Sequence, residues 1–221
     1  MKILTLYEKP VENIVKNLKL TRFLDIIPLS EEEGGKIRQL RRIPKDKPAI
    51  FLWGSGFNHG YSFFFDAEGM DLKVNFDAHS DAETKSNSLI HLYLSHMYQS
   101  SKKHNCESIL YCSRHFHRLT DKGFKLLNET QIGDIQNIGF TIDLDIIHYF
   151  PAEKLWWDDS QIYLDELIEN IKKAAEIFKG KLIRLDIGGL RENHPISKKE
   201  MDFAIMCYNE VLKTGYEIMM R

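Results

Sequence analysis

Three side chains that commonly bind metal ions occur at every second position of the segment Asp77-Ala78-His79-Ser80-Asp81. The segment directly follows residues 72–76, a short apolar run typical of a buried strand. A second acidic pair, Asp143 and Asp145, follows another strand-like run at residues 138–142. Two clusters of ligands, each at the end of a strand, predict one site that holds more than one metal ion.

The chemistry of the donors narrows the choice of metal. His59 follows a third strand-like run, at residues 49–53, and adds a second imidazole. The candidate ligands are carboxylates and imidazoles without a thiolate: His59, Asp77, His79, Asp81, Asp143 and Asp145. Such a set suits Mn²⁺, and also iron, cobalt or zinc. Aspartates crowded at one site repel one another, and two divalent ions would compensate their charge.

The elements that must position these residues alternate along the chain. Short apolar runs predict strands at residues 3–6, 49–53, 72–76, 108–112, 138–142 and 181–186. Helical spacing of apolar residues predicts helices at 88–100 and 161–178, and a capping box at Ser197 opens a helix through about residue 212. Alternation of this kind predicts an α/β fold, a three-layer α/β/α arrangement with a mostly parallel sheet. In such sheets, functional groups gather at the carboxyl ends of the strands.

Composition excludes several classes of function. The chain has 221 residues, of which 43% are hydrophobic and 28% charged, so we expect one globular domain over residues 1–221. A net charge of −2 gives no indication of nucleic acid as a partner, and no apolar run is long enough to cross a membrane. Cys106, Cys112 and Cys207 show no metal-type spacing. Free thiols and a cytoplasmic location are expected. Residues 30–35 are predicted to be an exposed loop, followed by a basic solvated face at residues 36–47.

The motifs resemble those of the arginase/agmatinase (ureohydrolase) family. Residues 77–81 are similar to its Asp-Ala-His-x-Asp motif, and residues 140–145 resemble its second motif, in which Asp-x-Asp ends a strand. Gly56-Phe57-Asn58-His59 resembles the Gly-Gly-Asp-His turn of the family in its histidine and its glycine context. These motifs occur in the family's order over roughly residues 49 to 195.

The resemblance implies a role for each candidate residue. One metal ion would be bound by His59, Asp77, Asp81 and Asp143, and the other by Asp77, His79, Asp143 and Asp145. A hydroxide between the two ions, which would be Mn²⁺, would attack the trigonal carbon of a guanidino or amidino compound and hydrolyse a non-peptide C–N bond. His91 matches the family's proton-shuttle histidine, and Glu192, in Glu192-Asn193-His194-Pro195, matches the glutamate that binds the guanidinium.

Departures from the family pattern leave the substrate and some alternatives open. His148 stands where the family has an acidic residue, and the loop between Asp186 and Glu192 is three residues longer. His115 and His117 are candidate substrate contacts without an assigned role. The alternatives are a deacetylase-like amide hydrolase with one zinc ion and a metal-binding pseudoenzyme of the same fold. The expected partner is a small-molecule substrate, and the resemblance also implies a homo-oligomer.

Overall fold

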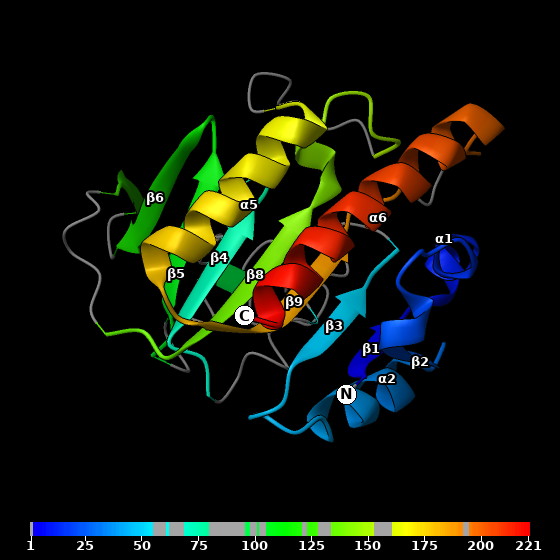
Figure 1. Cartoon of the computed structure of the whole chain (residues 1–221), viewed down its shortest axis with the longest axis horizontal. Helices are drawn as coiled ribbons and strands as arrows, with labels where there is room; N and C mark the ends of the chain where they lie inside the picture. Colours follow the sequence, from blue (N-terminus) through cyan, green and yellow to red (C-terminus); the bar gives the residue numbers. More distant parts are fainter. Residues whose placement is uncertain are drawn as a thin grey trace.

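The structure, a computed structural model, describes residues 2–54, 61, 69–79, 96–97, 101, 105–120, 123–127, 134–152, 161–191 and 195–221. Within these residues a nine-stranded sheet runs through the molecule, with helices packed against its faces (Figure 1). None of the helices in the described ranges combines the length and the apolar character that a bilayer span requires.

The sheet is parallel over most of its width. Its strands are β1 (Ile3–Tyr7), β2 (Leu24–Pro28), β3 (Ala49–Leu52), β4 (Leu72–Phe76), β5 (Glu107–Cys112), β6 (His115–Thr120), β7 (Gly123–Leu126), β8 (Asn137–Asp143) and β9 (Lys181–Gly188). They are arranged in the order β2-β1-β3-β9-β8-β4-β5-β6-β7. All pairs from β2 to β5 are parallel, and only β6 and β7 are antiparallel to their neighbours. The predicted mostly parallel α/β sheet is therefore confirmed.

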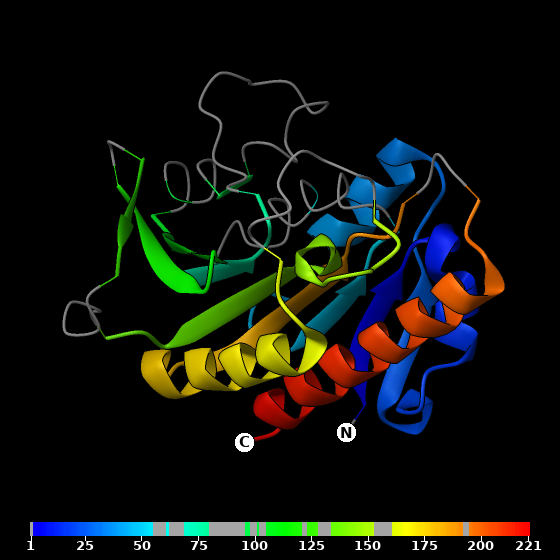
Figure 2. The ribbon, with the colours of Figure 1, turned by 90° about the horizontal axis from the view of Figure 1, so that it is seen from above.

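Helices lie on both faces of this sheet. Figure 2 shows α5 (Leu164–Phe178) and α6 (Lys198–Met219) side by side along one face, with α2 (Glu33–Arg41) on the other. The short helix α1 (Glu12–Lys16) packs into the same apolar core as α5 and α6. A smaller core under α2 joins Leu40 and Ile43 to the second face of β3. Because side chains alternate along a strand, each central strand contributes to both sides.

The second face is partly polar at its centre. On β4, Leu72, Val74 and Phe76 belong to the α5–α6 core, whereas Lys73 and Asn75 point the other way. The Nζ atom of Lys73 lies 2.9 Å from Nδ1 of His96, and both residues are completely buried. On the neighbouring strand β5, the Oγ atom of Ser108 donates a hydrogen bond to the carbonyl of Met97 at 3.1 Å. The buried Lys73 and Ser108 side chains on this face thus have hydrogen-bond partners in His96 and Met97.

Several predicted elements need correction. Helix α2 spans residues that fall in the predicted exposed loop and in the predicted basic face. Leu40 packs into the smaller core and stabilises this helix, which the Glu and Gly residues at its start do not indicate. Lys36 of that face is largely buried and forms an ion pair with Glu8. Strands β2, β6 and β7 were not predicted, and of the predicted 88–100 helix only His96 and Met97 are described, both helical.

The last helix is longer than predicted, because Gly215 does not interrupt it. α6 continues to Met219, and Gly215 faces Leu185 of β9. A Cβ atom at position 215 would lie 2.3 Å from Leu185 Cδ2, so the glycine allows the helix to approach the sheet closely. The three cysteines are free, as predicted, with Cys106 and Cys207 buried and Cys112 half-buried.

We expect Ser197→Ala to lower the free energy of unfolding by about 1 kcal/mol. Ser197 Oγ accepts from the Glu200 main-chain N–H at 3.3 Å, and Glu200 Oε2 accepts from the Ser197 N–H at 2.8 Å. The substitution leaves one of these donors at the helix start without its partner. Urea denaturation measures the loss, with the exposed Lys199→Ala as control. Equal stability of the two variants would show that the capping box contributes nothing.

Candidate metal centre

Neighbouring strand ends bring the two acidic motifs together. β8 lies between β4 and β9, with Phe76 opposite Ile142 and Asp143 opposite Gly188. The Asp77 N–H donates to the Tyr111 carbonyl at 3.3 Å, which continues the parallel pattern one residue beyond β4. Asp77 and Asp143 therefore stand at the same carboxyl edge of the sheet, as the strand pattern predicts.

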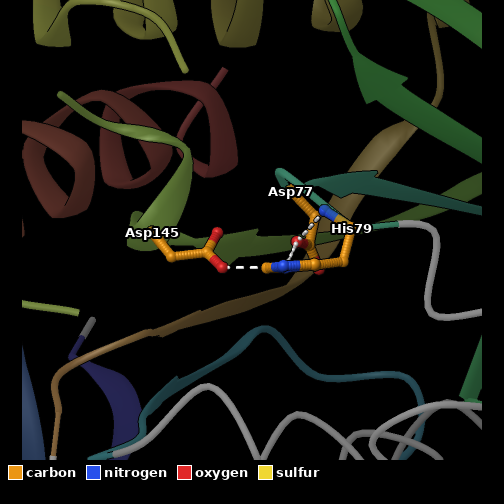
Figure 3. A group of neighbouring side chains, drawn as sticks. All are labelled: Asp77, His79 and Asp145. Atoms are coloured by element: carbon orange, nitrogen blue, oxygen red, sulfur yellow. Dashed lines mark hydrogen bonds and ion pairs between the residues drawn. The ribbon is translucent and has the colours of Figure 1, made fainter. Parts of the chain in front are cut away.

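Three of the predicted ligands converge at this edge: Asp77, His79 and Asp145 (Figure 3). One ligand atom from each lies within 4.8 Å of the others. His79 Nδ1 is 2.9 Å from Asp145 Oδ2 and 3.2 Å from Asp77 Oδ1. Among the residues that the structure describes, this is the group of His, Cys, Asp and Glu side chains that could bind a metal ion.

Two similar turns present these side chains. Asp77 Oδ1 accepts from the His79 N–H at 2.6 Å, and Asp143 Oδ1 accepts from the Asp145 N–H at 3.0 Å. In both motifs the first aspartate thus bonds the main chain two residues on, which is a common turn of Asp and Asn. The second turn opens the 3₁₀ helix η6 (Leu144–Ile146). The spacing of two residues in each motif is therefore a property of the turn as well as of the ligands.

Further hydrogen bonds tie the two turns to each other and to the next segment. The Ala78 N–H donates to Asp145 Oδ1 at 3.4 Å, so the first turn contacts the carboxylate of the second. Gln161 donates from Nε2 to the Asp145 carbonyl at 3.0 Å. Gln161 is the predicted first residue of a helix that in the structure begins at Leu164, and nothing in its local sequence indicates this contact. These contacts hold Asp145 from both sides.

The electrostatics of the group favour positive charge beside the two carboxylates. Asp77 and Asp145 are buried, at 1% and 9% exposure, and His79 is half-buried. Burial opposes the charge of the His79 imidazolium, but hydrogen bonds to Asp145 and Asp77 outweigh it and raise its pKa to about 11. Burial, together with the charge of Asp77, raises the pKa of Asp145 to about 6. Without a metal ion, the proton of His79 compensates one of the two carboxylate charges, and a divalent ion in its place could compensate both.

The chemistry of the three donor side chains suits a divalent metal ion. A neutral imidazole offers Nδ1 as a lone pair, and it points at the same spot as two carboxylate oxygens. Hard and borderline divalent ions prefer this combination. The second ring nitrogen, Nε2, is buried and has no hydrogen-bond partner within the described part of the chain.

Asp143 lies beside this group and is closely approached by the backbone of Gly189. It is 6% exposed, and Gly189, just beyond β9, approaches it with φ +112°. A Cβ atom on Gly189 would lie 2.3 Å from Asp143 Oδ1 and 2.8 Å from the Leu144 nitrogen. Only glycine adopts this conformation readily and leaves room for the acidic turn.

The other predicted site residues are placed as follows. His59, Asp81, His91 and Glu192 lie outside the described residues, so their assigned roles remain predictions. His115 is exposed at the start of β6, where it pairs with Cys112, and His117 pairs with Leu110. His148 is half-buried and its ring centroid lies 5.0 Å from that of Tyr163.

Comparison with known proteins identifies the fold. No family model and no curated protein matches the sequence. Solved structures do match. A proclavaminate amidino hydrolase from Streptomyces clavuligerus is 9% identical, with a TM-score of 0.67 over 99% of this chain and 93% of that one. A hypothetical agmatinase from Burkholderia thailandensis is 12% identical (TM-score 0.66; 96% and 85% covered). Formimidoylglutamase from Bacillus subtilis is 14% identical (TM-score 0.61; 99% and 88% covered).

Fold and site together define an α/β protein with a cluster of potential metal ligands at the carboxyl edge of a parallel sheet. Its fold is the arginase/agmatinase (ureohydrolase) fold, as the sequence motifs predict.

Proposed function

We propose that the chain is a metal-dependent hydrolase that cleaves a non-peptide C–N bond of a guanidino or amidino compound. The observation that carries the proposal is the convergence of His79 Nδ1 with the carboxylates of Asp77 and Asp145 on a sheet of the arginase/agmatinase fold. Structural neighbours named as agmatinase, amidino hydrolase and formimidoylglutamase support this substrate class, because each name denotes action on such a group or its close relative.

Two divalent ions would occupy the site, and we propose Mn²⁺, one of the ions that this set of carboxylates and imidazoles suits. In the proposed assignment Asp77, His79, Asp143 and Asp145 bind one ion, and His59, Asp77, Asp81 and Asp143 bind the other. Ions bound here would supply a Lewis acid and an activated water at neutral pH. Asp77, Asp143 and Asp145, which are buried at the strand ends, would bind and orient the ions.

Two further residues complete the proposal. The Glu192 carboxylate would hold the planar cationic group of the substrate by paired hydrogen bonds. The His91 imidazole would transfer a proton to the nitrogen of the departing amine, so that the C–N bond breaks as water adds to the carbon. Both assignments rest on the position of these residues in the sequence motifs.

The test is release of urea from guanidino compounds, or of formamide from formiminoglutamate, by protein loaded with Mn²⁺. The substrates are arginine, agmatine, 4-guanidinobutyrate and formiminoglutamate, which share a trigonal carbon bearing nitrogen and differ in charge at the other end. We expect turnover of one or more of them, and loss of that turnover after EDTA treatment followed by gel filtration. Renewed turnover after addition of Mn²⁺ separates metal dependence from damage by the chelator.

Metal analysis distinguishes the proposal from its alternatives. Two metal ions per chain with turnover support the hydrolase. Two ions without turnover of any of these compounds contradict it and favour a pseudoenzyme, whereas a single tightly bound zinc ion contradicts it in favour of the deacetylase-like alternative.

A further inference from the structure

We propose that Asn75 is a positioning residue for the metal centre, which it serves by orienting the carboxylate of Asp77. This inference rests on the proposed function, since it assumes that Asp77 binds a metal ion. Asn75 lies on β4, two residues before Asp77, on the polar second face of the sheet. Its Nδ2 atom donates to Asp77 Oδ2 at 3.1 Å.

The two oxygens of Asp77 are held by different donors. The His79 main-chain N–H donates to Oδ1, and the Asn75 amide donates to Oδ2. Two donors on opposite oxygens determine both the position and the plane of a carboxylate. The turn that contains His79 supplies the first donor and the strand supplies the second, so Asp77 is oriented from both sides of the strand end. Metal ligands are commonly oriented in this way by a second layer of hydrogen bonds.

A buried Asn at position 75 lowers the stability of the fold, and a role in orienting Asp77 would explain its presence there. It is completely buried within a strand, where an apolar or β-branched side chain would be expected. Its Oδ1 atom is buried and has no hydrogen-bond partner in the described ranges of the chain. A buried acceptor without a partner destabilises a protein. Among the described residues, the hydrogen bond of the Asn75 side chain is the one to Asp77.

The amide is also the right chemical group for this contact. A carboxylate only accepts hydrogen bonds, so its neighbour must donate. An Asp at position 75 would add a like charge beside Asp77, and a Lys would add a full positive charge that competes with the metal ion. The neutral NH₂ group of Asn donates without changing the net charge of the site.

The experiment compares Mn²⁺ affinity by isothermal titration calorimetry in the metal-free full chain and two variants. Asn75→Leu keeps the approximate shape of the side chain and removes the donor. Ser108→Ala is the matched control, because Ser108 is buried on the same sheet face and its bond goes to Met97, away from the metal ligands. We expect Asn75→Leu to bind Mn²⁺ about 10- to 100-fold more weakly. Ser108→Ala should bind it as the parent does.

The outcomes separate this inference from the proposed function. Mn²⁺ affinity in Asn75→Leu equal to that of the parent, while Asp145→Asn binds Mn²⁺ more weakly, overturns the positioning role alone. An equal loss of affinity in Ser108→Ala overturns it too, because the loss then reflects general disturbance of the sheet face. A parent that binds no Mn²⁺ contradicts both. Asn75→Ala, which adds no apolar group beside Asp77, keeps the comparison available if the leucine variant does not fold.

Discussion

Asp145→Asn is expected to reduce the rise in melting temperature that Mn²⁺ gives the parent protein, because one of the two proposed ions loses a ligand, and to lower turnover on the order of 10³-fold. The substitution keeps the shape of the side chain but removes the charge that faces His79 Nδ1 at 2.9 Å. In the parent, free metal at 100 times its Kd stabilises the folded state by about 2.7 kcal/mol. For a chain of this length that corresponds to a shift of about 5 to 10 °C.

The measurement is the difference between melting temperatures with and without Mn²⁺, so any effect of the variant on the metal-free protein cancels. Asp202→Asn is the control, because Asp202 is an exposed carboxylate on α6. It should keep the full shift and full turnover. A metal-dependent shift of parental size in Asp145→Asn would remove Asp145 from the metal centre.

Gly189→Ala should both destabilise the protein, by about 2 to 4 kcal/mol, and disrupt Mn²⁺ binding. The new side chain must adopt φ +112°, and its Cβ would lie 2.3 Å from Asp143 Oδ1 and 3.1 Å from the Asp145 nitrogen. Relief of these contacts displaces the turn that presents Asp143 and Asp145. Urea denaturation measures the stability, and titration with Mn²⁺ measures the binding.

Gly69→Ala separates backbone strain from displacement of the acidic turn. Gly69 also has a positive φ, +94°, but among the described residues the nearest atoms to a Cβ there are those of Lys45, at 3.8 Å. This variant should lose about 1 kcal/mol of stability through strain and bind Mn²⁺ normally. Equal Mn²⁺ affinities in the two variants would show that the contact of Gly189 with Asp143 does not support the site.

The central strands were predictable because they are buried on both faces. Short runs rich in apolar residues and bounded by polar or turn residues indicate β1, β3, β4, β5, β8 and β9, and all six are confirmed. β2 and β6 lack that signal. β2 is half-exposed, and β6 has the polar sequence His-Phe-His-Arg-Leu-Thr. Such strands form because a neighbour offers unpaired backbone groups, which local sequence does not reveal.

The start of helix α6 was predictable from local sequence, whereas its end was not. The capping box at Ser197 is a local hydrogen-bond pattern, so the start of α6 was predicted at the right residue. The helix continues past its predicted end, at about residue 212, through Gly215 to Met219, although glycine is unfavourable in a helix interior. Close packing against Leu185, a residue of a distant strand, makes the glycine acceptable.

The candidate site also combines features that depend on local sequence with features that depend on the tertiary structure. The amino-acid sequence alone determined the donors, their spacing and the two Asp turns, because these depend on side-chain chemistry and on hydrogen bonds between residues two positions apart. The meeting of Asp145 with His79, the contact of Gly189 with Asp143, and the bond from Asn75 to Asp77 required the tertiary structure. The first two depend on the order β9-β8-β4 and on how the strand ends face one another. Backbone hydrogen bonds between strands are the same for every neighbour, so no local pattern specifies which strands lie side by side.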